Sequence, residues 1–237
     1  MRFGAPLVRA TLLRRYKRFL ADVRLENGEL ATAHCPNTGS MMGCAEPGSP
    51  VWLSRSPNLH RKYALTWELV EVGEGSLVGI NTSRSNSLVR EAIETGVVAE
   101  LTGYEIIQPE VRLAEGDSRV DFLLEGGQRL APCYVEVKNV TAAVRDDIAL
   151  FPDAVSVRGS KHLRALAHAV GTGARGVVCF CVQRADVREV RPADAIDPEY
   201  GRLLREVTAA GVEAIAYKAA VSPSEIRLEA CVPVVCP

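Results

Sequence analysis

The sequence lacks any apolar run long enough to span a membrane, and no apolar segment follows the arginines near its N-terminus. We therefore expect no membrane anchor, no secretory signal and a cytoplasmic location. CxxC and CxxH pairs are missing although there are seven cysteines, so neither a zinc site nor a disulfide framework is expected. The chain also has no phosphate-binding glycine loop and no nucleophile triad, which argues against an enzyme acting on small molecules such as sugars.

An excess of positive charge is absent as well. The 237 residues carry a net charge of −1, so an argument for binding nucleic acid has to rest on local clusters. Apolar residues make up 47% of the chain and charged residues 24%, which is the composition of an ordinary soluble globular protein. This length allows one large domain or two small ones.

Short strands dominate the first third of the chain. Residues 10–23 predict a long strand, bent midway, that ends in the Asn27-Gly28 turn. Four further strands are predicted at 30–33, 51–54, 65–72 and 77–80. Five short strands without a convincing helix predict a small barrel, and barrels of the OB type present a basic groove to nucleic acid.

Two basic segments fall within this predicted barrel, and the second belongs to a stretch, residues 47–67, that contains no acid. A single charge cluster is usually a solvated face. Two clusters in one small barrel favour contact with phosphates. The DNA contacts predicted from the barrel are Arg14, Arg15, Lys17, Arg18, Arg55, Arg61 and Lys62.

The loop at residues 34–43 is dense in turn-forming residues and begins with a His34-Cys35 pair. A cysteine hydrolase is disfavoured there, because adjacent residues on an extended segment point apart and no catalytic partner is identifiable. We expect the backbone amides and hydroxyls of this loop to shape a domain interface or a phosphate pocket instead.

A polar run near residues 81–86 separates the barrel from a second region in which strands and helices alternate. One helix is predicted at 88–96, with Gly96 as its C-terminal cap, another at 160–170, capped by Ser160, and a third after the N-cap Asp197. Strands are predicted at 100–111, 118–125, 133–140, 176–183, 212–219 and 226–235. This pattern indicates a mixed sheet flanked by helices, as in α/β proteins.

Charged residues interrupt two of these strands. Side chains alternate along a strand, so Glu136 and Lys138 share one face while Val135 and Val137 fill the other. A hairpin turn at residues 125–128 would bring Asp121 alongside Glu136. Two carboxylates are costly to bury together, and a divalent cation with oxygen ligands compensates them. The alternative is an ordinary solvated strand, since the ExK pattern alone is common.

The spacing of Asp121, Glu136 and Lys138 resembles the active-site signature of PD-(D/E)xK nucleases. That resemblance implies carboxylates that hold Mg²⁺ or Mn²⁺ and a lysine beside the attacking water. Glu91, on the first helix, is a candidate third metal ligand, or else a surface glutamate. Lys161, at a helix start, is a candidate phosphate contact. Gln183, at a strand end, is expected to touch DNA, to orient the lysine or simply to cap its strand.

The chain as a whole resembles the sugar fermentation stimulation protein A (SfsA) family, in motif blocks that run from near residue 9 to near residue 218. The blocks include His34-Cys35-Pro36-Asn37-Thr38-Gly39, Thr66-Trp67-Glu68-Leu69, Ser118-Arg119-Val120-Asp121-Phe122, Tyr134-Val135-Glu136-Val137-Lys138-Asn139, Phe151-Pro152-Asp153, Gly159-Ser160-Lys161-His162-Leu163 and Val182-Gln183-Arg184. The resemblance implies a DNA-binding protein with an N-terminal OB-like β-barrel (1–82) and a C-terminal restriction-endonuclease-like domain (83–237), a two-domain fold of the α+β or α/β class.

Two functions remain open from the sequence. One is a DNA-binding, Mg²⁺-dependent phosphodiesterase. The other is a DNA-binding regulator of sugar metabolism whose nuclease scaffold does not cut. Both take DNA as the partner, neither involves a membrane, and both leave a homo-oligomer open.

Overall fold

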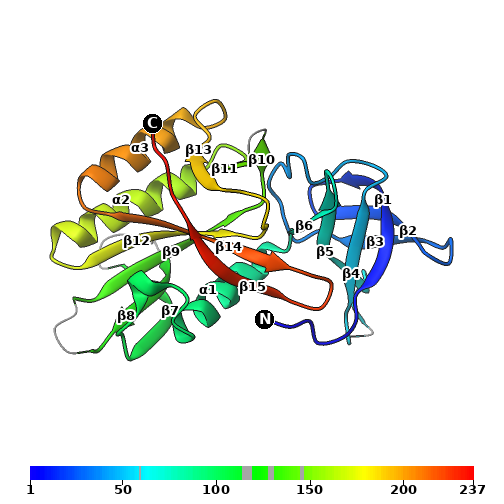
Figure 1. Ribbon diagram of the computed structural model, residues 1–237, viewed down its shortest axis with the longest axis horizontal. Coiled ribbons are helices and arrows are strands. Elements are labelled where there is room, and N and C mark those ends of the chain that lie inside the picture. The colour runs from blue at the N-terminus through cyan, green and yellow to red at the C-terminus, as the bar shows by residue number, and fades with distance from the viewer. Residues whose placement is uncertain (59, 114–118, 128–130, 145–146) are drawn as a thin grey trace.

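A computed structural model describes residues 1–58, 60–113, 119–127, 131–144 and 147–237. The chain forms a β-barrel on one side and a sheet covered by helices on the other (Figure 1). Within these residues, no helix has both the length and the apolar character that crossing a membrane requires.

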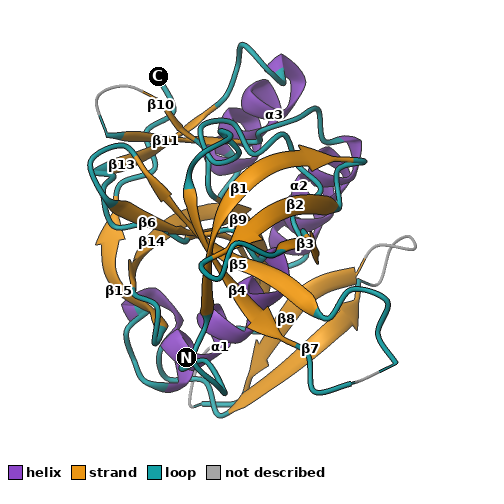
Figure 2. Cartoon of the chain, turned by 90° about the vertical axis from the view of Figure 1, so that its right-hand side faces the viewer, coloured by secondary structure: helices purple, strands orange, loops and turns teal. Residues whose placement is uncertain are grey.

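The N-terminal barrel consists of five strands, and a sixth extends it. The strands are β1 (Val8–Tyr16), β2 (Leu20–Leu25), β3 (Leu30–His34), β4 (Pro50–Arg55), β5 (Leu65–Val72) and β6 (Ser76–Gly79). Their order is β3-β2-β1-β4-β5-β6, and a parallel pairing of β3 with β5 closes the barrel. This is the OB fold that the strand pattern predicts. Figure 2 views the molecule from the barrel side.

The prediction of one long first strand is wrong. Residues 10–23 form two antiparallel strands, β1 and β2, in which Tyr16 pairs with Leu20. The chain reverses at Lys17 and Arg18, whose φ angles of 50° and 65° lie in the left-handed region. Sequence alone gives no warning, because neither residue is a glycine or asparagine, the usual signals of such a turn.

The second domain is built on a six-stranded mixed sheet in the order β15-β14-β12-β9-β8-β7. The strands are β7 (Ile106–Arg112), β8 (Arg119–Glu125), β9 (Cys133–Val140), β12 (Arg175–Val182), β14 (Glu213–Val221) and β15 (Ile226–Val232). The helices are α1 (Ser85–Glu94), α2 (Val157–Gly171) and α3 (Pro198–Ala209), with short 3₁₀ turns at Thr82–Arg84 and Ala99–Leu101. A small separate sheet of β10 (Ala143–Val144), β11 (Ile148–Phe151) and β13 (Glu189–Pro192) was not expected from the sequence.

Helices cover both faces of this sheet. On one face α1 packs over Val135, Val137 and Cys179. On the other, α2 and α3 pack over Val178 and Phe180 (Figure 1). Burial on both sides explains why β12 is a continuous apolar run, and its neighbours β9 and β14 both pair with it in parallel.

The helix boundaries follow the predicted caps, with one correction. Asp197 caps α3, and Gly96 follows α1 with a φ of +74°. Helix α2 begins three residues before the predicted start, because Ser156 and not Ser160 accepts a hydrogen bond at its N-terminus, from the Gly159 amide. Strand β7 starts at residue 106, after the 3₁₀ turn at Ala99–Leu101. Ser118, the first residue of the strand predicted at 118–125, and Gln128, the last residue of the predicted hairpin turn, lie outside the described residues.

Candidate active site

Asp121 and Glu136 stand opposite each other where strands β8 and β9 separate. The two strands pair antiparallel through Phe122 and Val135, and one more step in that register sets Asp121 against Glu136. Beyond this pair, the Val137 amide donates to Oδ2 of Asp121 at 2.7 Å, so the side chain takes the place of a ladder partner. The antiparallel pairing expected from the sequence is therefore present, and Asp121 and Glu136 are close enough for their charges to interact.

The Asp121 carboxylate is half-buried and held from two sides. Its Oδ1 accepts a hydrogen bond from Nδ2 of Asn86, in the first turn of α1, at 2.8 Å. Burial and the nearby negative charge of Glu136 together raise the pKa of Asp121, although the Val137 amide and Asn86 act in the opposite direction. A positive charge nearby would stabilise the ionised form of this carboxylate.

Glu136 is buried and binds two basic side chains through one oxygen. Nζ of Lys138 donates to Oε1 at 2.6 Å, and Nδ1 of His162, on α2, is hydrogen-bonded to the same atom. Burial alone would raise the pKa of Glu136, but the contacts with His162 and Lys138 outweigh it and lower the pKa. The second oxygen, Oε2, is buried, and no described residue forms a hydrogen bond with it. A buried oxygen of this kind is an unused ligand position.

Family models match both domains of the chain. Residues 13–80 match the model described as the SfsA N-terminal OB domain, and residues 83–225 match the sugar fermentation stimulation protein RE domain. This chain belongs to the sugar fermentation stimulation protein family. The barrel and the restriction-endonuclease-like sheet are thus the two domains of an SfsA protein.

Relatives match the chain over almost its full length. The sugar fermentation stimulation protein homolog of Thioalkalivibrio sulfidiphilus is 61% identical, over 97% of this chain and 95% of that protein. The homolog of Pelobacter propionicus is 62% identical, over 97% of this chain and 98% of that protein. A solved structure of Pyrococcus furiosus SfsA in complex with Ca²⁺ is 28% identical, with a TM-score of 0.87 over 99% of this chain and 98% of that chain.

The donors of the Asp121–Glu136 pair are of the kind that a hard divalent cation prefers. Asp121 and Glu136 offer oxygen atoms only, and Oε2 of Glu136 has no other partner among the described residues. Oxygen ligands, few in number and supplemented by water, are typical of Mg²⁺ sites. Within the described residues, however, there is no group of three or more His, Cys, Asp or Glu side chains placed to hold a metal ion. A cation at this point would therefore have two carboxylates from the described residues as ligands.

Glu91 is engaged elsewhere. Its carboxylate lies 2.6 Å from the N-terminal amino group of Met1 and is 44% exposed. Asn86, five positions earlier on the same helix, is the α1 residue that contacts Asp121. Five helical positions correspond to a rotation of about 140°, so the two side chains leave α1 in different directions.

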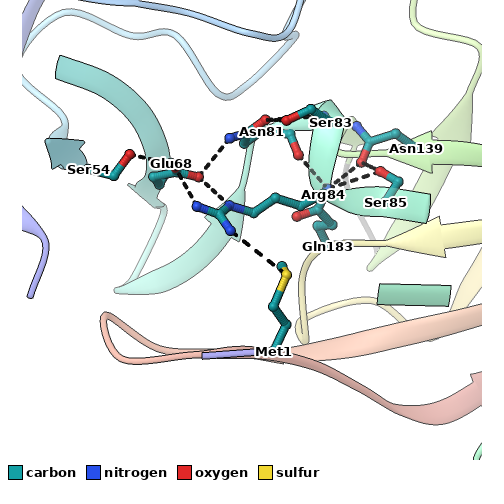
Figure 3. Close-up of polar contacts among 9 residues, drawn as sticks. All are labelled: Met1, Ser54, Glu68, Asn81, Ser83, Arg84, Ser85, Asn139 and Gln183. Atoms are coloured by element: carbon teal, nitrogen blue, oxygen red, sulfur yellow. Dashed lines mark hydrogen bonds and ion pairs between the residues drawn. The ribbon is translucent and has the colours of Figure 1, made fainter. Parts of the chain in front are cut away.

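Gln183 joins the two domains, which corrects its assignment as a direct DNA contact. It is completely buried, and its Nε2 donates to the carbonyl oxygen of Asn81, to Oγ of Ser85 and to Oδ1 of Asn139. Figure 3 shows Gln183 beside Ser85 and Asn139. Gly79 approaches so closely that a β-carbon there would lie 2.5 Å from Oε1 of Gln183. Lys161, by contrast, is exposed at the start of α2.

The basic residues predicted on the barrel fall into two groups. Three use their charge within the protein: Arg14 pairs with Asp22 at 2.8 Å, and Arg15 and Arg18 donate to backbone carbonyls of the 37–40 loop. The other four are exposed, and among the described residues none has a carboxylate within ion-pair distance; they are Lys17, Arg55, Arg61 and Lys62. Of the seven predicted DNA contacts on the barrel, these four are available to a ligand.

The 34–43 loop belongs to the domain interface, as its composition suggested. The Met41 amide donates to Oδ2 of Asp153 in the second domain at 3.1 Å, and Sγ of Cys44, just beyond the loop, is 3.6 Å from the Thr141 carbonyl. Cys35 is fully buried, and burial raises the pKa of its thiol. A buried thiol with a raised pKa is a poor nucleophile, in agreement with the case against a cysteine hydrolase.

Sequence reasoning missed two residues that hold the carboxylates, Asn86 and His162. Asn86 lies in the polar run that marks the domain boundary, and His162 adjoins the predicted phosphate contact Lys161. The available signal for His162 was its position in the first turns of a helix that follows the ExK strand. No spacing rule connects either residue to Asp121 or Glu136, because the contacts are made across the sheet.

Proposed function

We propose that this protein binds DNA and cleaves phosphodiester bonds with the help of a divalent cation, Mg²⁺ or Mn²⁺. The observation that carries the proposal is that Asp121 lies within electrostatic reach of Glu136 and Lys138, while Oε2 of Glu136 is buried with no hydrogen-bond partner among the described residues. The Ca²⁺ in the Pyrococcus furiosus SfsA structure supports it, because Ca²⁺ is also a hard cation that prefers oxygen ligands.

The side chains have distinct roles in this proposal. Asp121 and Glu136 hold the cation, which supplies Lewis acidity and lowers the pKa of bound water. Asn86 and the Val137 amide fix the direction of the Asp121 carboxylate. Lys138, only 11% exposed, presents its ammonium group beside Glu136, where it orients the attacking water. His162 holds Oε1 of Glu136, which leaves Oε2 for the cation.

The barrel supports the choice of DNA as substrate. OB folds bind oligonucleotides with the face of their second and third strands and with the loops that join β1 to β2 and β4 to β5. Lys17 lies in the first of these loops, and Arg61 and Lys62 lie in the second. Cationic side chains at both loops could contact successive phosphates of one DNA strand.

The deciding experiment is incubation of the purified protein with labelled single- and double-stranded DNA in Mg²⁺, Mn²⁺ or EDTA. We expect cleavage in metal only, reduced at least about a hundredfold in Asp121→Ala, Glu136→Ala and Lys138→Ala. Glu229→Ala, which removes an exposed carboxylate on β15, is the matched control and should cleave normally. Equal cleavage by the wild type and the three site variants would refute the assignment.

A second candidate function is DNA binding without cleavage, as in a transcriptional regulator of sugar metabolism. The observation in its favour is that the described residues supply only two carboxylates, one of which already binds Lys138 and His162. This candidate predicts DNA binding that EDTA and Lys138→Ala leave unchanged, with no cleavage under any metal condition.

A further inference from the structure

A cavity of about 760 Å³ lies between the barrel and the N-terminal end of α1. The barrel contributes His34, from the end of β3, and Arg61, from the loop after β4. The N-terminal segment contributes Phe3, and the turn before α1 contributes Arg84. The Asp121–Glu136 site is not part of this lining, so the cavity is a separate feature of the molecule.

Glu68 fixes the floor of the cavity. Its carboxylate is almost completely buried and accepts hydrogen bonds from Oγ of Ser54 at 2.6 Å, Nδ2 of Asn81 at 2.8 Å, and Nε and Nη2 of Arg84 at 2.6 and 2.8 Å. Burial alone would raise the pKa of Glu68, but these donors outweigh it and lower the pKa. Figure 3 shows Arg84 reaching from the start of α1 to Glu68 on β5. The floor is therefore rigid and ionised before any ligand arrives.

The charges around the cavity favour an anion. Glu68 and Arg84 neutralise each other. Burial and the charge of Arg61 lower the pKa of His34, so it is uncharged at neutral pH. Arg55 and Arg61 remain, and among the described residues no carboxylate lies within ion-pair distance of either. Two guanidinium groups without an acid suit a phosphate, which they bind through paired hydrogen bonds.

The rest of the lining suits a flat ring. The Arg84 guanidinium lies over the Phe3 ring at 4.8 Å, and Pro36 and Pro57 add further apolar surface. The hydroxyl oxygens of Ser56 and Ser83 are further acceptors in the lining, although the Ser83 hydroxyl already donates to Oδ1 of Asn81 at 2.6 Å. A volume of this size is typical of small-ligand sites and has no room for a base-paired duplex.

We propose that this cavity binds one unpaired nucleotide, with its phosphate at Arg55 and Arg61 and its base against Phe3 and Arg84. The choice of a nucleotide as the ligand rests on the proposed DNA-binding function. The cavity and the charges that line it are independent of that function. For a DNA substrate, the inference assigns single-stranded DNA, or a strand end, as the preferred form, because a base has to leave its partner to enter.

The test is calorimetric titration of the full-length protein in EDTA, which removes any effect of cleavage. The ligands are thymidine monophosphate, thymidine, inorganic phosphate and an oligodeoxythymidylate of about ten nucleotides. We expect thymidine monophosphate and the oligonucleotide to bind the wild type, and thymidine and inorganic phosphate to bind at least about tenfold more weakly.

Arg55→Ala/Arg61→Ala should weaken binding of both phosphorylated ligands at least about tenfold. Arg202→Ala, which removes an exposed arginine on α3, is the matched control and should bind normally. The two arginines are exposed, so their removal leaves the barrel core intact. Thermal unfolding of the double variant verifies that it is folded.

The outcomes separate this inference from the proposed function. Unchanged binding of the oligonucleotide by the double variant would refute the cavity while leaving DNA binding in place. Arginine-dependent binding of thymidine monophosphate, with none of the oligonucleotide, would support the cavity and refute DNA as the substrate. Equal affinity for inorganic phosphate and thymidine monophosphate would refute the role assigned to Phe3 and Arg84.

Discussion

Asp121 is held in an environment that disfavours its charge. Burial and the neighbouring Glu136 raise its pKa, so the native state binds the proton more tightly than the unfolded chain does. Ionisation of Asp121 therefore opposes folding, increasingly as the pH rises above 3.8 and fully above the native pKa. Below the ordinary value of 3.8 both states are protonated and this opposition disappears.

We predict that Asp121→Asn is more stable than the wild type in EDTA at pH 7, with a melting temperature higher by a few degrees. The amide of Asn86 can turn over to accept a hydrogen bond from the new side chain, so the site keeps its contacts. The gain should shrink as the pH falls through the native pKa of Asp121 and vanish below about 3.8. Thermal unfolding across this pH range measures it.

Added Mg²⁺ or Ca²⁺ should reverse the order of stability, because a cation that binds only the native wild type raises its melting temperature. Asp194→Asn is the control: a hydrogen bond from Arg205 lowers the pKa of that exposed carboxylate, so the variant should show no gain. An Asp121→Asn protein that is less stable than the wild type at pH 7 in EDTA would contradict the account.

At the scale of elements, the end of β12 couples the barrel to β9, the strand that carries the candidate site residues Glu136 and Lys138. Gln183 follows β12 directly, and its side chain reaches the turn before α1, the first residue of α1 and Asn139 on β9. Its backbone carbonyl accepts a hydrogen bond from the Gly79 amide at the end of β6 at 2.8 Å. One buried residue thus touches four elements from both domains.

We predict that Gln183→Leu destabilises the protein by about 2 kcal/mol, because leucine fills a similar volume but leaves buried acceptors without a donor. Urea unfolding measures the change. Gln108→Leu, at an exposed position on β7, is the control and should be nearly neutral. Loss of stability by both variants to the same extent would argue against a special role for Gln183.

At the scale of the whole molecule, the net charge of −1 conceals an uneven distribution of charge. Exposed cations gather at two barrel loops, whereas many surface acids elsewhere are paired with arginines, as in the Glu199–Arg202 and Asp194–Arg205 pairs of the second domain. A ligand with a phosphate backbone would therefore meet the barrel loops with little competition from acids.

We predict that DNA binding in EDTA weakens linearly on a plot of log affinity against log salt. Lys17→Ala/Lys62→Ala should reduce the slope by about 1.4 to 1.8, since each lost phosphate contact removes about 0.7 to 0.9. Fluorescence anisotropy at several salt concentrations measures the slope. Arg227→Ala, which removes an exposed arginine on β15 of the second domain, should leave it unchanged. A slope that is the same in all three proteins would place the DNA elsewhere.

Much of the fold was predictable because it follows from local rules. Alternation and turn residues located most strands. Asp197 marked the start of α3 because its side chain caps the helix, and Gly96 marked the end of α1 because glycine readily adopts a positive φ. The hairpin between β8 and β9 also made it possible to expect Asp121 beside Glu136. Local rules failed at Lys17 and Arg18, where ordinary residues adopt a left-handed turn, and at Ser160, which lies inside a helix that Ser156 starts.

The sequence by itself determined the family, through motif blocks along nearly the whole chain, and the two-domain architecture, through local strand and helix patterns. It also predicted that two carboxylates and a lysine meet, because they lie on two strands that are close along the chain. Only the tertiary structure decided which side chains surround them. Asn86 and His162 reach the carboxylates from helices on opposite faces of the sheet. The cavity above Glu68 likewise unites the N-terminal segment, the barrel and the start of α1. Contacts between distant segments depend on how the elements pack, and no periodicity in the sequence records that packing.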